Sequence, residues 1–370
     1  MLGFFFLFFI ALGWRYRTLR LLKTMRLMPA VASCSPPTGK TEKISVIIPM
    51  KNEEANARAC VKAFLAQDYP DFEVIAVNDN SSDLTEDILK SLPIHYINAP
   101  PKPEGWTGKN FAIHQAVPKA SGEWFLFTDA DTRHEKSSLS SALAHAQNRG
   151  LDFLTLLPRC LTGSFLENMI QPLAMALLGL WFPIEKINNP DSALYFANGQ
   201  YLLIRRGLYE KLCGHEAVRG EFLEDFALAR KAKEIKARTE CALGKAIYGT
   251  RMYNSLDAIW RGWRRIYLHA FKKNARALAA RAVETVFLSV VPFLMPALFL
   301  FPGLPFKSGI IFSGFLILVF VILIISWKAY KIVDGKPAFA FLHPLAAVFI
   351  AFFLLDASFI AATGRKTVWR

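Results

Sequence analysis

Short apolar runs, separated by polar segments that favour turns, fill the middle of the chain. Six of them have the length and composition of buried strands, and they cover residues 44–49, 73–77, 94–97, 124–127, 153–156 and 201–204. Segments with helical character alternate with these runs. A strand, helix, strand order implies right-handed crossovers, so the sequence predicts an α/β domain with a parallel sheet. We place this domain at residues 44–255.

The first 43 residues have a different pattern. Residues 2–12 are apolar and rich in Phe, but this run is shorter than the roughly 20 residues of a spanning helix. Basic residues follow it up to position 26, so residues 1–28 are predicted to be a short membrane anchor with a basic cytoplasmic flank. An interfacial helix is the alternative. A cleaved signal peptide fits less well, because its positive region should precede the apolar run. Residues 29–43, polar with Pro and Gly, are interpreted as a linker.

The last third of the chain is again apolar. Three runs, at 283–301, 309–327 and 339–362, are each near the length that crosses a bilayer. Residues 283–370 are therefore predicted to hold three transmembrane helices and a tail. The basic loop at 328–336 would be cytoplasmic, on the same side as the α/β domain of this predicted multi-pass cell-membrane protein. The basic tail would then end outside, against the same rule, so either one span does not fully cross or the tail is overruled.

Two further segments have alternative interpretations. Residues 256–282 are basic and aromatic, which suits an interfacial helix on an anionic surface or a lid over a diphosphate. Residues 165–184 are mostly apolar. They form either a buried core helix or an amphipathic helix in the membrane interface beside the active site.

Net charge narrows the range of partners. The 370 residues have a formal net charge of +14, which suits nucleic acid, an anionic membrane surface or an anionic substrate. No pattern of a nucleic-acid-binding module is present, and the basic residues crowd beside apolar segments. A membrane surface together with an anionic nucleotide donor is therefore favoured. The five cysteines have no metal or redox spacing, which indicates reduced thiols facing a cytoplasm.

Candidate chemistry begins at the end of the 124–127 run, where Asp129 and Asp131 follow. Ligands of open α/β sheets bind outside the carboxyl ends of the strands. Two carboxylates there suit Mg²⁺ or Mn²⁺ carrying a diphosphate. The alternative is that Asp129 caps a following helix and Asp131 is a solvated turn residue.

Three other features accompany this pair. Asp79 follows a strand, Lys109 opens a helix after a Gly-rich loop, and Glu224-Asp225 opens a later helix. A sugar nucleotide needs a carboxylate for the base and ribose and a metal for the diphosphate. It also needs a cation for the leaving phosphate and a general base for the acceptor hydroxyl. The set as a whole predicts transfer of a sugar.

The chain resembles membrane-bound glycosyltransferases of family 2 with the GT-A fold, and among them the carotenoid- and hopanoid-associated group. The motifs that carry the resemblance are Ser45-Val46-Ile47-Ile48-Pro49, Asn52-Glu53-Glu54, the turn Val77-Asn78-Asp79-Asn80-Ser81-Ser82-Asp83-Leu84-Thr85, Gly105-Trp106-Thr107-Gly108-Lys109, Asp129-Ala130-Asp131, Asn198-Gly199, Gly214-His215 and Glu224-Asp225.

The resemblance implies a role for each candidate residue. Pro49, Glu53 and Asp79 would bind the uridine end of a UDP-sugar. Asp129 and Asp131 would hold Mg²⁺ or Mn²⁺, and Lys109 is assigned to the donor phosphates. Asp225 would be the catalytic base of a single displacement that inverts the anomeric carbon. Glu224 is the next candidate, and the alternative for Asp225 is a favourable charge at a helix N-terminus.

Processive members of this family carry Gln-x-x-Arg-Trp after the base. The corresponding stretch here, Trp260-Arg261-Gly262-Trp263-Arg264-Arg265, lacks that Gln and the final Trp. Transfer of one sugar to a membrane lipid, of carotenoid, hopanoid or glycolipid type, is therefore favoured over a processive polysaccharide synthase. Arg261 or Arg264 could still bind the diphosphate. An inactive membrane scaffold is a third possibility. A soluble nucleotide-binding module disagrees with the apolar last third.

Overall fold

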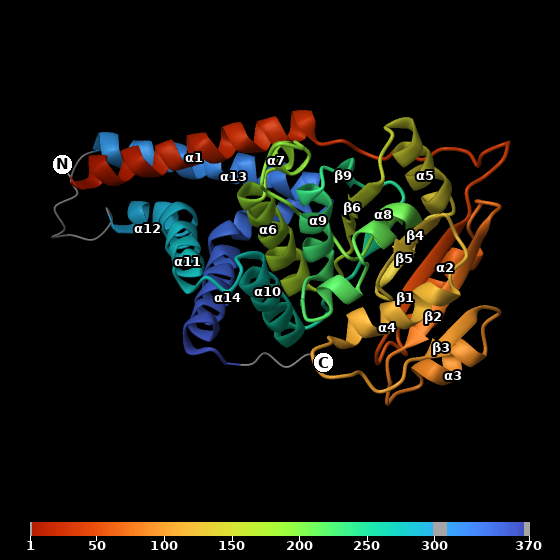
Figure 1. Cartoon of the computed structure of the whole chain (residues 1–370). Helices are drawn as coiled ribbons and strands as arrows, with labels where there is room; N and C mark the ends of the chain where they lie inside the picture. Colours follow the sequence, from red (N-terminus) through yellow and green to blue (C-terminus); the bar gives the residue numbers. More distant parts are fainter. Residues whose placement is uncertain (1, 299–308, 366–370) are drawn as a thin grey trace. The chain divides into compact units, whose positions relative to one another are not determined.

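The computed structural model describes residues 2–298 and 309–365 (Figure 1). Contacts divide the chain into two compact units, each treated by itself below. The sheet unit comprises Met28–Arg159 and Ile184–Met252, and the helical unit comprises Met1–Leu27, Cys160–Pro183 and Tyr253–Arg370. Residues 160–183, which we had included in a domain spanning 44–255, thus group with the helices.

The sheet unit is built on seven strands in the order β3-β2-β1-β4-β8-β6-β9. Their bounds are β1 Ile44–Met50, β2 Phe72–Asn78, β3 His95–Asn98, β4 Trp124–Phe127, β6 Phe153–Leu157, β8 Leu202–Arg205 and β9 Thr239–Leu243. The pairs among β3, β2, β1 and β4 are parallel, as predicted. Short strands β5 (Thr132–His134) and β10 (Tyr248–Thr250) form an antiparallel pair, and β7 is Arg159–Cys160.

Strand β8 runs antiparallel to both β4 and β6, so the prediction of a wholly parallel sheet is wrong at this strand. The turn before β8 lies beside the end of β6, where Leu156 N donates to Tyr201 O and Asn198 N donates to Thr155 Oγ1. The chain therefore enters β8 from the edge at which the parallel strands end. A strand that starts at that edge must run in the opposite direction.

Helices cover both faces of this sheet. They are α2 Ala57–Leu65, α3 Thr85–Lys90, α4 Gly108–Ala116, α5 Ser138–Asn148, α7 Ile184–Ile187, α8 Arg206–Lys211 and α9 Glu224–Glu234. Val46 and Ile48 of β1 face one core with α2 and α5, whereas Ile47 faces a second core with α4 and α9. Successive residues of a strand point to opposite faces. Burial on both sides explains why β1 is apolar without alternation.

Strand β1 extends one residue beyond the predicted run 44–49, past Pro49 to Met50. Thr128 N donates to Ile47 O, and β4 ends there. The backbone groups of Ile47 point toward β4, and those of Pro49, two residues further on, point the same way. At Pro49, however, β4 has already ended. The missing N–H of Pro49 therefore costs no ladder hydrogen bond.

The segment predicted to be a linker, 29–43, is held against the sheet. Val31 N donates to Leu243 O and Leu243 N donates to Pro29 O, both at 2.8 Å, which extends the sheet beyond β9. The Glu42 carboxylate accepts hydrogen bonds from Trp124 Nε1, Gln147 Nε2 and Arg205 Nη1. This polar segment is thus an ordered edge of the domain.

In the helical unit, residues 2–12 and their basic flank form one helix, α1 (Leu2–Leu27), which is longer than the apolar run suggested. Helix α1 lies along α13 (Gly309–Ile332) (Figure 1). The Leu7 side chain occupies the space into which a Cβ on Gly314 would project. Helix α6 (Phe165–Trp181) begins at a capping box made by Ser164 and Glu167, and every residue from 167 to 174 is buried. This burial matches the core-helix alternative for 165–184.

The basic and aromatic segment 256–282 forms two helices, α10 (Leu256–Ala270) and the start of α11 (Ala275–Ser289), separated by a turn. Trp263 and Tyr267 of α10 are buried in the core of the helical unit. This half of the segment therefore uses its aromatic residues for packing.

Two stretches of the described residues are long and apolar enough to cross a membrane, α13 and Pro337–Thr363, which includes α14 (His343–Thr363). Helices α11 and α12 (Val291–Leu298) would supply a third span if this pair, bent by 43°, counts as one. The predicted span 283–301 ends outside the described residues, as does the tail from 366 onward.

Candidate active site

The carboxyl ends of three parallel strands bring the predicted donor-binding residues to one edge of the sheet. Met50 pairs with Asn78 at the ends of β1 and β2, and Ile47 pairs with Phe127 at the end of β4. Asp79 and Asp129 follow directly, so both lie at the edge where ligands of open α/β sheets bind.

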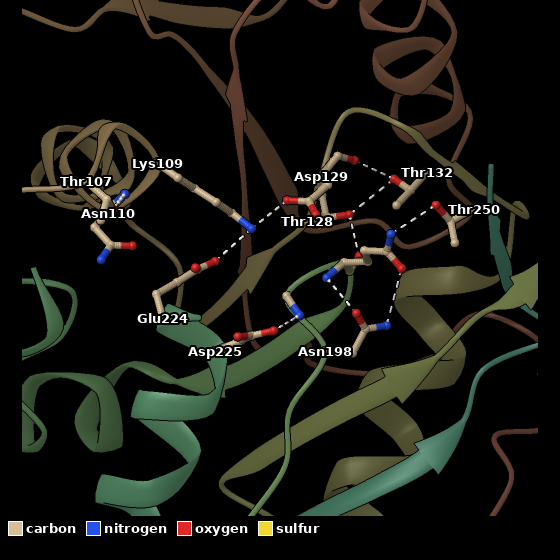
Figure 2. A network of polar contacts seen from close by, with 12 residues as sticks. Thr107, Lys109, Asn110, Thr128, Asp129, Thr132, Asn198, Glu224, Asp225 and Thr250 are labelled. Carbon is tan, nitrogen blue, oxygen red and sulfur yellow. Dashed lines mark hydrogen bonds and ion pairs between the residues drawn. The ribbon is translucent and has the colours of Figure 1, made fainter. Parts of the chain in front are cut away.

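Lys109 links the Asp-x-Asp pair to the acidic pair of α9. Its Nζ lies 2.7 Å from Asp129 Oδ1 and 2.7 Å from Glu224 Oε1 (Figure 2). Lys109 is the second residue of α4, whose N-terminus is capped by the Thr107 side chain. Burial lowers the pKa of this ammonium group, but the negative charges of Asp129, Glu224 and Asp225 outweigh burial and raise it. Lys109 is therefore a permanent positive charge at the centre of the cluster.

Asp225 is held by backbone N–H groups. Gly199 N donates to its Oδ2 at 2.6 Å, and Phe226 N donates to its Oδ1 at 2.8 Å. Burial and the neighbouring charge of Glu224 raise the pKa of Asp225 to about 7, although Lys109 opposes the shift. A carboxyl group with a pKa near neutrality can accept a proton at physiological pH, as a general base must. The bond to Phe226 N also shows the role of a charge at a helix N-terminus, so the two interpretations of Asp225 are compatible.

Gly199 allows the backbone to approach this cluster. A Cβ at this position would lie 3.1 Å from Lys109 Nζ, 3.2 Å from Asp225 Oδ2 and 3.2 Å from Glu224 Oε1. Asn198 anchors the turn, because its Nδ2 donates to Leu156 O and to Tyr248 Oη. The Asn198-Gly199 motif thus supplies a backbone donor to Asp225 at a position where a Cβ would crowd three charged side chains.

A buried hydroxyl network supports the Asp-x-Asp loop. Thr128 Oγ1 donates to Gln200 O at 2.8 Å, and Thr132 Oγ1 donates to Asp129 O at 2.7 Å. His134 Nε2 lies 2.9 Å from Thr132 Oγ1. Burial, followed by the charge of Arg133, lowers the pKa of His134 to about 3, so this imidazole is neutral. Our sequence analysis did not identify His134, since a lone histidine after a strand has no distinguishing spacing.

Asp131 fits the role of a metal ligand. Its Oδ1 is buried without a hydrogen-bond partner, and burial, with the charges of Asp129 and Glu53, raises its pKa well above the usual range. A divalent cation would satisfy that oxygen and relieve the repulsion. Within the described residues no group of three or more His, Cys, Asp or Glu forms a preformed metal site.

No helix follows Asp129, since β5 begins at Thr132, so the helix-cap alternative is wrong. The buried Oδ1 of Asp131 also disagrees with a solvated turn residue.

The residues predicted to bind uridine lie beside this pair. Burial raises the pKa of Glu53, as does the charge of Asp129, and the carboxylate accepts a hydrogen bond from Asn56 Nδ2 at 2.9 Å. Asp79 is 5% exposed, with its Oδ2 3.6 Å from Lys51 Nζ. A Cβ on Gly108 would lie 2.5 Å from Asp79 Oδ2. The second glycine of the Gly-Trp-Thr-Gly-Lys loop therefore lets α4 begin against this carboxylate.

His215 of the Gly214-His215 motif is a structural residue in this arrangement. Its backbone N donates to Tyr209 Oη at 3.0 Å, and its Nδ1 lies 2.8 Å from the same oxygen. Burial, together with the charge of Lys109, lowers its pKa to about 3. Gly214 has φ of +48°, and a Cβ there would collide with the Tyr209 ring. The motif holds α8 against the segment that leads to α9.

Arg261 and Arg264 belong to the helical unit. Arg261 pairs with Asp257 one turn earlier, and Arg264 Nη1 lies 3.0 Å from Asp356 Oδ2 of α14. Their binding to a donor diphosphate stays a prediction.

An α/β sheet with an Asp-x-Asp pair, a lysine and an acidic pair at its carboxyl edge defines a glycosyltransferase domain of the GT-A class. Residues 45–213 match the model of glycosyl transferase family 2, so this part of the chain is a domain of that family. The fold and the family resemblance drawn from the sequence are thereby confirmed.

Curated relatives agree with this assignment. A probable glycosyltransferase of Bacillus subtilis is 36% identical over 105 residues, which are 26% of this chain and 24% of that protein. A 4,4'-diaponeurosporenoate glycosyltransferase of Staphylococcus haemolyticus is 24% identical over 236 residues, which are 60% of each chain. A GalNAc(5)-diNAcBac-PP-undecaprenol beta-1,3-glucosyltransferase of Campylobacter jejuni is 30% identical over 110 residues, 28% of this chain and 34% of that protein. Each match spans less than two thirds of the relative's length.

A solved structure shares the fold over nearly the whole chain. The mannosyltransferase of Pyrobaculum calidifontis, in complex with GDP-Man and Mn²⁺, superimposes with a TM-score of 0.56 at 16% identity. The match covers 99% of this chain and 100% of that one.

Proposed function

We propose that this chain is an inverting glycosyltransferase that moves one sugar from a UDP-sugar to a membrane lipid. The observation that carries the proposal is the bridge made by Lys109, with Asp129 on one side and Glu224 on the other. Through this bridge Lys109, a cation suited to bind the leaving phosphate, contacts the acidic pair Glu224-Asp225, which contains the candidate base.

The donor side would be formed by the sheet edge. Asp129 and Asp131 would hold Mg²⁺ or Mn²⁺, and the bound metal would neutralise charge on the diphosphate leaving group. Lys109 would bind the same diphosphate from the start of α4. Pro49, Glu53 and Asp79 would bind the nucleoside. The solved mannosyltransferase that shares the fold holds GDP-Man, so a test of donors includes both nucleotides.

The acceptor side would be centred on Asp225. Its carboxylate would remove the proton from the acceptor hydroxyl while that oxygen attacks the anomeric carbon and the bond to the diphosphate breaks. One displacement of this kind inverts the anomeric configuration. Glu224 is engaged by Lys109, whereas Asp225 has the raised pKa expected of a base, which favours Asp225.

Candidate membrane spans in the same chain support a lipid acceptor and a location in the cell membrane. The catalytic domain would be cytoplasmic, because the basic loop at 328–336 then agrees with the positive-inside rule. Two relatives have compatible names, since one acts on 4,4'-diaponeurosporenoate and the other on an undecaprenol-linked glycan. An acceptor that stays in the bilayer requires an enzyme held beside it.

The test is transfer from radiolabelled UDP- and GDP-sugars by the full chain in liposomes of host lipids with Mn²⁺. Wild type is compared with Asp225→Asn and with the matched control Asp87→Asn, whose carboxylate is exposed and pairs with Lys90. We expect label in an organic-extractable lipid with wild type and the control, and a loss of at least about 100-fold with Asp225→Asn. Label in a water-soluble polymer would instead establish a polysaccharide synthase. No transfer from any donor would refute the proposal.

A further inference from the structure

The loop that leads into α9 is fastened to the first turn of α4. Asn110 Nδ2 donates to three backbone oxygens of that loop, Val218 O at 2.8 Å, Arg219 O at 3.2 Å and Glu221 O at 3.0 Å. The Asn110 side chain is fully buried. Three carbonyl oxygens around one amide atom identify it as the nitrogen, since only the NH₂ group can donate.

Two backbone contacts strengthen this attachment. Thr107 N donates to Arg219 O at 2.8 Å. A Cβ on Gly220 would lie 3.3 Å from Gly105 O, tighter than ordinary van der Waals contact. The loop 218–221 is thus packed against the Gly-Trp-Thr-Gly-Lys segment along its backbone.

The residues joined by this clamp flank the candidate chemistry. Asn110 follows Lys109 directly, and the loop 218–221 ends three residues before Glu224. The bridge from Lys109 to Glu224 requires α9 to begin at its present distance from α4. The bond from Gly199 to Asp225 requires the start of α9 to keep its place against the turn before β8.

We infer that Asn110 is a positioning residue for the acidic pair. Its amide holds the loop 218–221 so that Glu224 reaches Lys109 and Asp225 faces the acceptor hydroxyl. This inference rests on the proposed function and assigns Asn110 no contact with substrate. Loss of the amide removes this donor from Val218 O and Glu221 O and leaves Arg219 O with Thr107 N alone, and the loop then relaxes.

The consequence is specific to the chemical step. A displacement of the base by about 1 Å can reduce a rate by about 100-fold. Donor binding depends mainly on residues at the sheet edge, which the loop does not carry. For Asn110→Ala we therefore expect kcat to fall by about 10- to 100-fold while KM for the donor changes by less than about threefold.

Asn188→Ala is the matched control. Asn188 also makes two side-chain bonds to backbone, Nδ2 to Cys241 O at 3.0 Å and Cys241 N to its Oδ1 at 2.8 Å, at strand β9. If the asparagine-to-backbone bonds only stabilise the domain, both variants should unfold at a lower temperature than the wild type. Their kcat per folded molecule should then be unchanged. A selective fall of kcat in Asn110→Ala supports positioning.

A second pair of variants does not depend on Asn110→Ala folding. Gly220→Ala displaces the same loop by a few tenths of an ångström, whereas Gly207→Ala adds a methyl group in open space. We expect the fall in kcat with Gly220→Ala and none with Gly207→Ala. The assay is single-sugar transfer by the full chain in liposomes, with kcat referred to folded protein.

Wild-type kcat in both Asn110→Ala and Gly220→Ala, or an equal fall of kcat in Asn188→Ala, would overturn the inference while leaving the proposed function in place. If Asn110→Ala does not fold, wild-type kcat in Gly220→Ala alone overturns it. Absence of transfer by wild type would overturn the proposed function, and the inference with it.

Discussion

The bridge made by Lys109 is a direct target for a stability measurement. Its Nζ lies 2.7 Å from Asp129 Oδ1 and from Glu224 Oε1, and the Lys109 and Glu224 side chains are 17% and 8% exposed. Lys109→Met keeps the length of the side chain and removes its charge. Glu224 would then be a buried carboxylate without its cation, which costs about 3 to 5 kcal/mol in other proteins.

A loss of about 3 kcal/mol corresponds to a fall of roughly 6 to 12 °C in unfolding temperature for a domain of about 200 residues. The assay is thermal unfolding of the full chain in detergent, without metal or donor. Lys90→Met is the control, because Lys90 pairs with Glu86 while 51% exposed, and we expect no measurable change there.

The double variant Lys109→Met/Glu224→Gln removes both charges of the pair. We expect it to unfold at a higher temperature than Lys109→Met alone, because no buried carboxylate is then left at position 224. A change of less than about 2 °C in Lys109→Met, or a double variant no more stable than the single one, would contradict the bridge.

Three further results are expected. Because the pKa of Asp225 is raised to about 7 and a base must be ionised, kcat should rise with pH through about 7 and then level off; a rate independent of pH between 5 and 9 would exclude it as the base. Gly199→Ala should lower kcat, since its Cβ would lie 3.1 to 3.2 Å from three side-chain atoms of the cluster, whereas Gly39→Ala, in open space, should not. Asp131→Asn should abolish the rise in unfolding temperature that Mn²⁺ with UDP gives the wild type, and an undiminished rise would remove Asp131 from the metal site.

The strands were predictable because a strand that is buried on both faces of its sheet is a continuous run of apolar residues, which the sequence shows directly. Strand β4 was predicted with its observed bounds, since every residue from Trp124 to Phe127 is apolar and buried. The direction of β8 was not predictable, because it depends on where the chain returns to the sheet. The segment 29–43 was misread for a related reason: its bonds to β9 use backbone atoms, which composition does not reveal.

The site was predictable in its residues and much less in its contacts. Lys109, Asp129 and the acidic pair were recognised from motif order, and the structure brings them together. The partners of Asn110 lie 108 to 111 residues away, and no spacing in a single sequence indicates them. The requirement for glycine at position 199 could not be predicted either, because it comes from side chains of α4 and α9 that are distant in the sequence and pack against it.

The charges around the site favour a metal on electrostatic grounds that are independent of the family. Five carboxyl groups lie around Lys109 in two sets, Glu53, Asp129 and Asp131 in one and Glu224 and Asp225 in the other. Lys109 and Arg133 contribute two positive charges to them. A diphosphate would add further negative charge to a site in which neighbouring carboxylates already help to raise the pKa of Glu53, Asp131 and Asp225. A divalent cation held by Asp129 and Asp131 would reverse this balance, because it would screen the carboxylates and attract the diphosphate at once. The same reasoning indicates that donor and metal bind together, and that UDP without metal binds weakly.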